Sequence, residues 1–212
     1  MAQRIVHYLF GELITQQVAL SDKKRFLLGS IIPDSLKTGD RDRSHFKVRT
    51  ATHVYLDFKA YRNQFLDLMM QDDFYLGYYM HLVEDAFYRT FIYQERFTMP
   101  RTQEEIALLH NDYHILNSYI VRKYHLHNEL EKDAIVPVYA SLDSIADFQV
   151  DEALEKLSAE FTEQIHGSTV FLTENMLDEF IKTYIPLAVD EVRALKSGKT
   201  MLKDNCSWLR RR

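Results

Sequence analysis

The sequence has little of the residues that build disulfide-rich or turn-rich folds. Among 212 residues there is a single cysteine, Cys206, so no disulfide can form within the chain. Glycine occurs six times and proline four times. Both counts are low for this length and argue against a sheet-rich fold with many tight turns. The scarcity of these residues therefore favours long helices.

The chain also lacks a long apolar run and an excess of positive charge. No segment is apolar enough over its length to span a bilayer. The first twenty residues are interrupted by His7, Glu12 and Gln16, so we expect no signal peptide and a cytoplasmic protein. The net charge of -5 argues against binding to a nucleic-acid duplex, which needs a basic face. Small phosphate esters remain open as substrates.

Apolar residues at helical spacing cover most of the chain. They predict helices over residues 4–20, 51–70, 73–97, 103–124, 151–166 and 173–196. Residues 30–50 are rich in charge and are expected to form an ordered loop. We therefore predict one all-α domain of about seven helices over residues 1–200, followed by a frayed basic tail over 201–212. The sequence does not indicate a role for residues 125–212.

Several residues predict where these helices begin, end or bend. Ser21 or Asp22 is expected to cap a short helix that ends at Gly29. Thr102 begins a capping-box pattern ahead of the 103–124 helix. Pro186 predicts a kink or a break in the last helix, because proline cannot donate the hydrogen bond of a helix interior.

The most informative motif is FYLGYYMHLVED at residues 74–85. In a helix, His81 and Asp85 lie one turn apart on the same face. Burying an imidazole and a carboxylate is costly unless something compensates, and a metal ion is one such partner. A core histidine bonded to a nearby acid is the simpler alternative. Asp34 in GSIIPDS and His45 in SHF would complete four nitrogen and oxygen ligands for zinc.

Other histidines are weaker candidates. His110 and His114 are one helical turn apart, a spacing that lets two imidazoles chelate one ion. A partly exposed helix face explains the same pair. His7 lies in an apolar helical segment, where a hydrogen-bonded core histidine is the common alternative. The remaining histidines are expected to be structural or solvated: His53, His125, His127 and His166.

The order of these segments resembles the bacterial zinc-dependent phospholipase C family, which is similar in structure to the S1/P1 nucleases. Five segments between about residues 4 and 120 carry the resemblance: HYLF (His7), GSIIPD (Asp34), SHF (His45), FYLGYYMHLVED (His81, Asp85) and LHNDYH (His110, His114). The resemblance implies a multi-helix domain of the phospholipase C/P1 nuclease type. It also implies that the first zinc is bound at the positions Asp34, His45, His81 and Asp85.

The resemblance further implies roles for individual residues. Asp34 would also be the general base toward water. His7 and Asp85 would help to hold a second zinc, and His110 and His114 a third.

The chain departs from the family pattern at three points. It begins Met-Ala-Gln, where secreted members use a processed N-terminal tryptophan as a ligand. No histidine follows Asp85 in AFYRTFIY, and His114 replaces the family's final acid. The four-ligand set is complete. The resemblance therefore implies one zinc or similar divalent ion, leaves a second one open, and argues against a cluster of three.

The leading hypothesis is a zinc-dependent hydrolase of a small phosphate ester, with a phosphodiester favoured. Arg89, one turn beyond Asp85, would bind the substrate phosphate, although a helix salt bridge to Asp85 is the more common outcome. The alternative is a non-catalytic helical protein that is stabilised by its metal and binds a partner. The sequence lacks the His-Asp dipeptide of the HD phosphohydrolases, which argues against that class.

Overall fold

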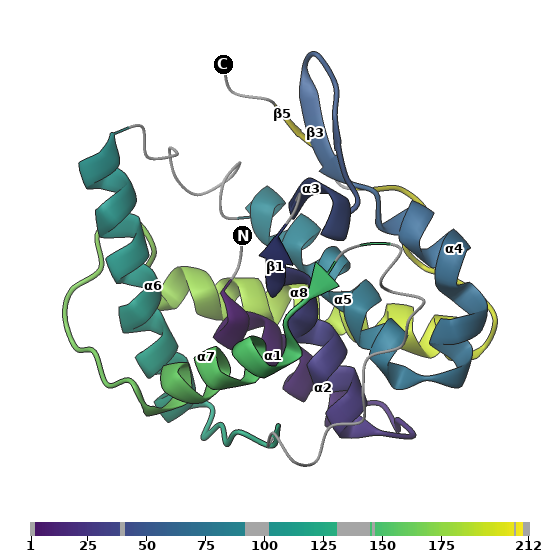
Figure 1. Ribbon diagram of the computed structural model, residues 1–212, viewed down its shortest axis with the longest axis horizontal. Coiled ribbons are helices and arrows are strands. Elements are labelled where there is room, and N and C mark those ends of the chain that lie inside the picture. Colours follow the sequence, from purple (N-terminus) through teal and green to yellow (C-terminus); the bar gives the residue numbers. More distant parts are fainter. Residues whose placement is uncertain are drawn as a thin grey trace.

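The computed structural model describes residues 3–38, 41–91, 102–130, 145, 147–205 and 207–209, and these are mainly helical, as the sequence predicts (Figure 1). The helices are α1 (Arg4–Thr15), α2 (Lys23–Ile31), the 3-10 turn η1 (Ile32–Asp34), α3 (Arg41–Ser44), α4 (Phe58–Gln71), α5 (Asp73–Tyr88), α6 (Gln103–Lys123), α7 (Val150–Thr162) and α8 (Glu174–Lys196). The strands are β1 (Leu36–Thr38), β2 (Lys47–Arg49), β3 (His53–Leu56), β4 (Asp147–Phe148) and β5 (Ser207–Leu209).

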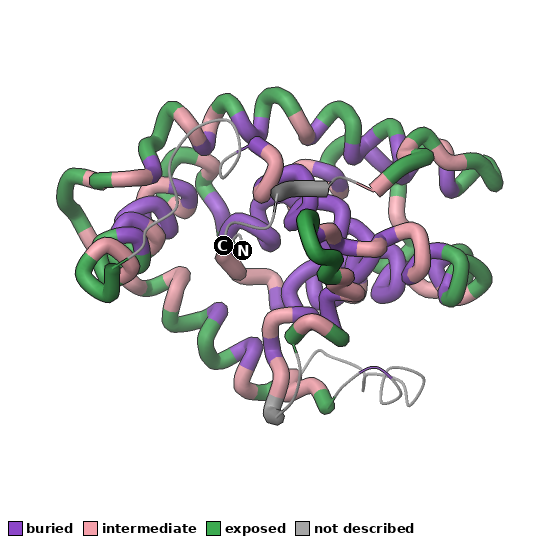
Figure 2. Tube along the Cα trace, turned by 90° about the horizontal axis from the view of Figure 1, so that it is seen from above, coloured by how far each residue is buried: buried purple, intermediate pink, exposed green. Residues whose placement is uncertain are grey.

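Helix α5 is the centre of the fold, and every one of its sixteen residues is buried. Helices α1, α2, α4 and α8 pack around it. The buried segments gather in the middle of the molecule, while the outer helices carry the exposed residues (Figure 2). A helix that is apolar nearly all round has to lie inside the protein. This explains why FYLGYYMHLVED becomes the core, with its few polar residues held in the interior.

Helices α2 and α5 cross at two glycines. A Cβ atom on Gly29 would lie 2.0 Å from the Phe74 carbonyl oxygen, and one on Gly77 would lie 2.0 Å from the Phe26 carbonyl oxygen. No larger residue fits this backbone-to-backbone approach. The prediction that Gly29 ends the helix is therefore wrong, since α2 continues to Ile31. The close crossing brings the turn after α2, which carries Asp34, alongside α5.

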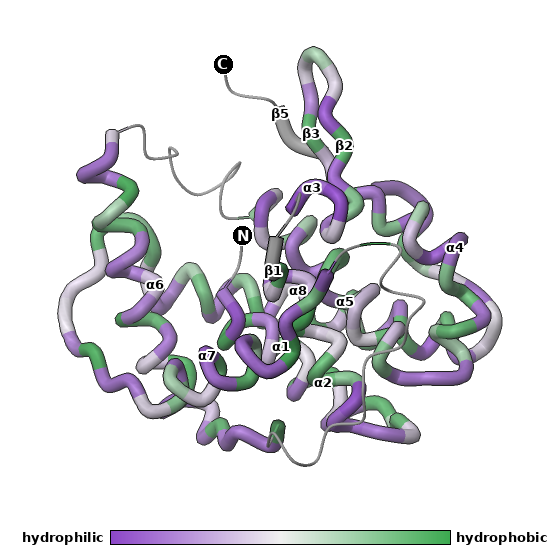
Figure 3. Tube along the Cα trace, viewed as in Figure 1, coloured by the Kyte–Doolittle hydropathy of each residue, from purple (hydrophilic) through white to green (hydrophobic). Residues whose placement is uncertain are grey.

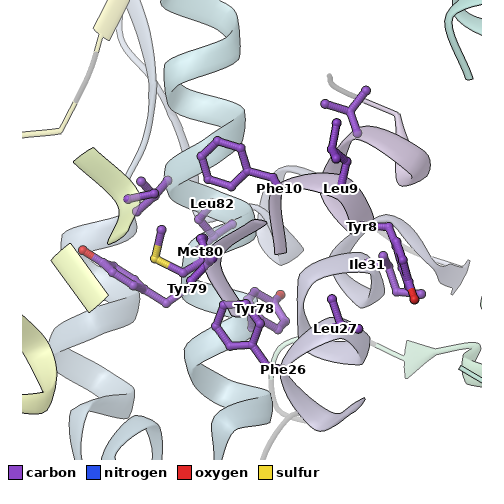
Figure 4. Packing of buried hydrophobic residues seen from close by; sticks show 14 of the residues in the cluster. Tyr8, Leu9, Phe10, Phe26, Leu27, Ile31, Tyr78, Tyr79, Met80 and Leu82 are labelled. Atoms are coloured by element: carbon purple, nitrogen blue, oxygen red, sulfur yellow. The ribbon is translucent and has the colours of Figure 1, made fainter. Parts of the chain in front are cut away.

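Aromatic and aliphatic side chains fill the space around this crossing (Figure 4). The Tyr61 and Tyr78 rings stack with their centroids 4.7 Å apart, and the Tyr78 hydroxyl donates a 2.6 Å hydrogen bond to the Ser44 carbonyl oxygen. Outer helices such as α6 and α7 instead alternate between hydrophilic and hydrophobic residues (Figure 3). Tyr61 and Tyr78 are therefore part of the core, and Tyr78 ties α3 to α5.

Two small sheets, which the all-α prediction does not include, join distant parts of the described chain. Strands β2, β3 and β5 form an antiparallel sheet in that order, and β1 pairs antiparallel with β4. The helix predicted from residue 51 begins only at Phe58, because Val54 and Leu56 are buried on alternate positions of a strand. The expected loop over 30–50 contains the end of α2, the turn η1, the short helix α3 and two of these strands.

The expectation of a frayed tail is also wrong for the residues that the structure describes. The Glu191 carboxylate accepts hydrogen bonds from the backbone N–H groups of Met201 and Leu202, at 2.6 Å and 2.9 Å. Arg62 donates to the Leu202 carbonyl oxygen at 2.9 Å. Further on, β5 pairs with β3. These contacts bind the chain after α8 to the body of the protein.

Two predicted helix caps are confirmed, whereas the helices predicted over 4–20 and 151–166 end earlier, at Thr15 and Thr162. Asp22 caps α2 through the Arg25 N–H, and Thr102 forms the expected capping box with Glu105. Helix α8 runs through Pro186 as one helix, and Pro186 is exposed, where water can satisfy the freed carbonyl group. The predicted end of the 73–97 helix lies outside the described residues. No helix in the described part of the chain combines the length and the apolar character needed to cross a membrane.

Candidate metal centre

Six ionisable side chains from four segments converge beside α5. The segments are α1, the turn η1, the end of α3 and the second half of α5. The residues are His7, Asp34, His45, His81, Glu84 and Asp85. Five of them are at most 1% exposed, and the Asp34 side chain is 12% exposed. The four ligands predicted for one ion lie within this cluster.

The His45 imidazole contacts the other three predicted ligands. Its Nε2 atom lies 3.2 Å from His81 Nε2 and 3.3 Å from Asp34 Oδ1, and 3.9 Å from the nearer Asp85 oxygen. Zinc–nitrogen bonds of about 2.0–2.1 Å in a tetrahedron place neighbouring ligand atoms roughly 3.3 Å apart. The two shortest spacings therefore fit the edge of a tetrahedral zinc site.

Backbone carbonyl groups orient the imidazoles of His45 and His81. His81 Nδ1 lies 2.8 Å from the Ser30 carbonyl oxygen, and His45 Nδ1 lies 2.9 Å from the Arg41 carbonyl oxygen. A carbonyl oxygen only accepts, so each Nδ1 carries a proton, and a ring without a second proton has its lone pair on Nε2. The two lone pairs then face each other at 3.2 Å, beside two carboxylates. Such a set of acceptors is favourable only with a proton or a metal cation among them.

His45 faces one oxygen of Asp34 and one of Asp85, and His7 faces the other oxygen of each of these two carboxylates. Its Nε2 atom lies 3.5 Å from Asp34 Oδ2 and 3.9 Å from Asp85 Oδ1, and its ring stacks on His81 with centroids 3.9 Å apart. Its Nδ1 atom contacts Glu84. His7 Nε2 and Asp34 Oδ1 are buried and make no hydrogen bond. Asp34 and Asp85 thus each lie within 3.9 Å of both His45 and His7. Two overlapping groups of possible ligands result, namely His45, His81 and Asp85, and His7, Asp34 and His81.

The charges in the cluster oppose one another. Burial lowers the pKa of His7, but the Glu84, Asp34 and Asp85 carboxylates outweigh burial and raise it to about 10. Burial, with the positive charge of His7, lowers the pKa of His81 to about 3. Burial would raise the pKa of Asp34, yet the contacts with the imidazoles hold it well below its usual value. Ionised carboxylates and a neutral His81 are the forms that bind metal.

Sequence reasoning missed the contacts that surround the ligands. Glu84 directly precedes Asp85 in the apolar helix, and a second acid in such a helix is a signal that could have been used. The carbonyl oxygens of Ser30 and Arg41 have no signal in the sequence, because every residue carries one. Phe46, which follows His45, has a positive φ of 49°. The partly buried Phe46 ring packs edge-on against Tyr61, while His45 lies in the cluster.

The structure does not bring His110 and His114 to this cluster. Both lie on the exposed face of α6, and His114 Nδ1 is 2.9 Å from Glu163 Oε2. Among the described residues, neither belongs to a group of three or more possible ligands. The predicted third site is therefore corrected to a solvated helix face. The four remaining histidines, at positions 53, 125, 127 and 166, are exposed, as expected.

Arg89 lies at the edge of the cluster. Although burial would raise the pKa of Asp85, the charges of Arg89 and the imidazoles keep it below its usual range. Burial and the charge of Arg89 also lower the pKa of Lys47. Lys47 and Phe46 line a pocket of about 590 Å³ between α3, β2 and α4. Arg89 is therefore within electrostatic reach of both Asp85 and Lys47, and Lys47 is one of the residues that line this pocket.

Comparisons with protein-family models, with curated proteins and with solved structures find no match to this chain.

Proposed function

We propose that this protein is a metal-dependent hydrolase of a phosphate ester, with a phosphodiester as the favoured substrate. The observation that carries the proposal is the convergence of Asp34, His45, His81 and Asp85 around two opposed Nε2 lone pairs. Such a buried set of acceptors is costly without a cation. Nitrogen and oxygen donors at tetrahedral spacing suit zinc best, and other divalent transition metals accept the same donors.

A second ion is proposed on the His7 side, where His7 Nε2 lies 3.5 Å from Asp34 Oδ2 and 3.9 Å from Asp85 Oδ1. When bound, divalent cations at these positions supply Lewis acidity, which lowers the pKa of water toward about 7 and offsets charge on a phosphoryl group. Two cations that share carboxylates are a common arrangement for in-line displacement at phosphorus. The proposal is therefore one resident ion, with a second that completes the centre.

The protein's own residues would then supply the remaining steps. Asp34 has the most exposed side chain of the cluster, at 12%, so water and substrate are expected to approach from its side. Its carboxylate would accept a proton from the attacking water, as a general base. Arg89 would bind the phosphoryl oxygens with its guanidinium group. His45 and His81 would keep their Nε2 lone pairs directed inward, because backbone carbonyl oxygens hold their Nδ1 protons.

We also propose that the fold is of the phospholipase C/P1 nuclease type. Support comes from the order of His7, Asp34, His45, His81 and Asp85 along a mainly helical chain, and from their convergence on one cluster. The substrate is expected to be a small phosphate ester rather than a nucleic-acid duplex, since the chain carries a net charge of -5.

A second function remains in competition, namely a helical protein that uses a buried ion only for stability and binds a partner. The near-complete burial of five of the six cluster residues favours it, because a closed site has no open position for water or substrate.

One experiment separates the two functions. The purified protein is analysed for metal per chain and is then assayed on bis-p-nitrophenyl phosphate and p-nitrophenyl phosphate, before and after chelation and zinc re-addition. We expect turnover that chelator removes and zinc restores. A protein that contains metal but cleaves neither ester supports the purely structural role. A protein with no metal contradicts both functions.

A further inference from the structure

Glu84 is a buried acid that the first-ion site does not use. It is 1% exposed, lies on α5 between the ligands His81 and Asp85, and contacts the Nδ1 atom of His7 on α1. Its second oxygen, Oε1, is buried and makes no hydrogen bond. An apolar residue at this position would satisfy a fully buried helix, and a buried ion pair is weak evidence for a role in stability alone. Stability alone therefore does not explain why a carboxylate is buried at Glu84.

The three imidazoles of the cluster differ in what holds their Nδ1 protons. His45 and His81 donate to neutral backbone carbonyl oxygens, whereas His7 faces a carboxylate. A carboxylate partner fixes the tautomer, makes the opposite nitrogen a stronger donor to metal, and adds negative charge close to the ion. With the Nδ1 proton on the Glu84 side, His7 directs its Nε2 lone pair toward Asp34 Oδ2 and Asp85 Oδ1.

We propose that Glu84 is a positioning residue that enables His7 to bind the second ion, so that occupancy of the His7 side depends on Glu84 while the His45–His81 side does not. This inference rests on the proposed metal centre. The two proposed zinc positions would then differ in affinity and in the groups that hold the Nδ1 protons of their histidine ligands. Glu84 itself is not expected to contact the phosphate ester, because His7 lies between it and the shared carboxylates.

The test compares Glu84→Gln and Glu84→Leu with the wild-type protein by zinc titration against a chromophoric chelator at neutral pH. Loss of an outer-shell partner weakens metal affinity by about 10–100-fold. We expect the weaker of two zinc affinities to fall by that factor in Glu84→Leu and less in Glu84→Gln, which retains an acceptor. The tighter affinity should change by less than about two-fold. Glu191→Gln removes a buried carboxylate outside the cluster and should leave both affinities unchanged.

Two further measurements distinguish positioning from a merely structural effect. In a His7→Ala background, Glu84→Leu should cause no additional loss of zinc affinity, because its effect acts through His7. In nitrogen-15 spectra of the imidazoles, Glu84→Leu should change the tautomer signature of His7 and leave those of His45 and His81 as they are.

The outcomes separate this inference from the proposed function. Wild-type protein that binds no zinc contradicts both. Wild-type protein that binds a single zinc, lost in His81→Ala, supports the metal centre and overturns the role of Glu84. Two zinc ions whose affinities fall equally in Glu84→Leu, or do not fall, also overturn the role of Glu84 alone.

Discussion

Two buried polar clusters lie on opposite sides of α5, and they are satisfied in different ways. In the first, the Glu191 carboxylate accepts hydrogen bonds from Tyr79, Thr200 and the backbone after α8. Arg62 adds a positive charge 3.4 Å away. In the second, Asp34 Oδ1 and Glu84 Oε1 are buried without a hydrogen bond. Donors and acceptors match in the first cluster and acceptors exceed donors in the second.

The difference indicates what each cluster is for. A network with every partner present contributes to stability and a unique fold, and it offers nothing to a ligand. A cluster with excess acceptors is unstable unless a cation joins it. We therefore describe the Glu191 cluster as a clamp on the chain after α8, and the His45–His81 cluster as a metal centre. The following predictions test this division, from the largest expected effect to the smallest.

Removing a ligand should abolish tight metal binding. His81→Ala deletes the Nε2 atom that lies 3.2 Å from His45 Nε2, and we expect zinc affinity to fall by more than the roughly 100-fold known for outer-shell partners. Elemental analysis after gel filtration measures the zinc that remains per chain. Unchanged stoichiometry would remove His81 from the ligand set.

Removing the proposed base should affect turnover more than metal content. In Asp34→Asn, the side chain keeps its shape but loses its capacity to accept a proton. We expect kcat on a phosphodiester to fall by about 10²–10⁴-fold, the usual contribution of a general base. Because Asp34 is also a proposed ligand, zinc per chain is measured in the same preparation, and kcat is expressed per bound ion. A normal kcat per ion would exclude Asp34 as the base.

Breaking the clamp should lower stability without affecting metal. Glu191→Leu leaves Arg62 buried without its charged partner, and loss of one partner of a buried pair costs about 3–5 kcal/mol of unfolding free energy. Urea unfolding of the zinc-loaded protein measures this loss. The double substitution Arg62→Met/Glu191→Leu should recover part of it. A lower zinc stoichiometry in either folded variant would contradict the separation of the two clusters.

The pH dependence of the metal-free protein should reveal the charge imbalance. His7 has a folded pKa raised to about 10 from 6.5, so the stability it contributes is complete below pH 6.5 and is lost as the pH rises toward 10. His81 has a folded pKa lowered to about 3, so stability falls as the pH drops from 6.5 toward 3. For one proton the slope reaches at most about 1.4 kcal/mol per pH unit. Urea unfolding in chelator from pH 4 to 9 should show a maximum near pH 6.5.

Zinc should reverse the alkaline part of this profile. A divalent cation replaces the proton on His7, so binding releases that proton and the affinity rises with pH. Zinc-loaded protein should therefore gain stability relative to the metal-free form between pH 6.5 and 9. Parallel profiles for the two forms would argue against His7 as a ligand.

The sequence predicted the parts of the site that depend on local spacing. His81 and Asp85 share a helix face by periodicity alone, and the order of the polar motifs indicated that Asp34 and His45 would join them. The crossing of α2 and α5 was not predictable in the same way. Gly29 has the local signature of a helix end, and only the approach of Phe74 explains why it lies inside a helix. Close backbone contacts between distant segments leave no periodic signal.

The smallest effect is expected for His110 and His114, which the sequence predicted as metal ligands and the structure places on an exposed helix face. The spacing of His110 and His114 fits chelation and an exposed helix face equally well, and only burial distinguishes them. Both are exposed, and His114 pairs with Glu163. Replacing both histidines with alanine should change zinc affinity by less than about two-fold and unfolding free energy by about 0.5 kcal/mol or less, as for exposed pairs. Chelator-competition titration beside His81→Ala provides the comparison. A large loss of zinc would mean that α6 approaches the centre, and that Glu163 holds His114 away from a position it occupies when metal is bound.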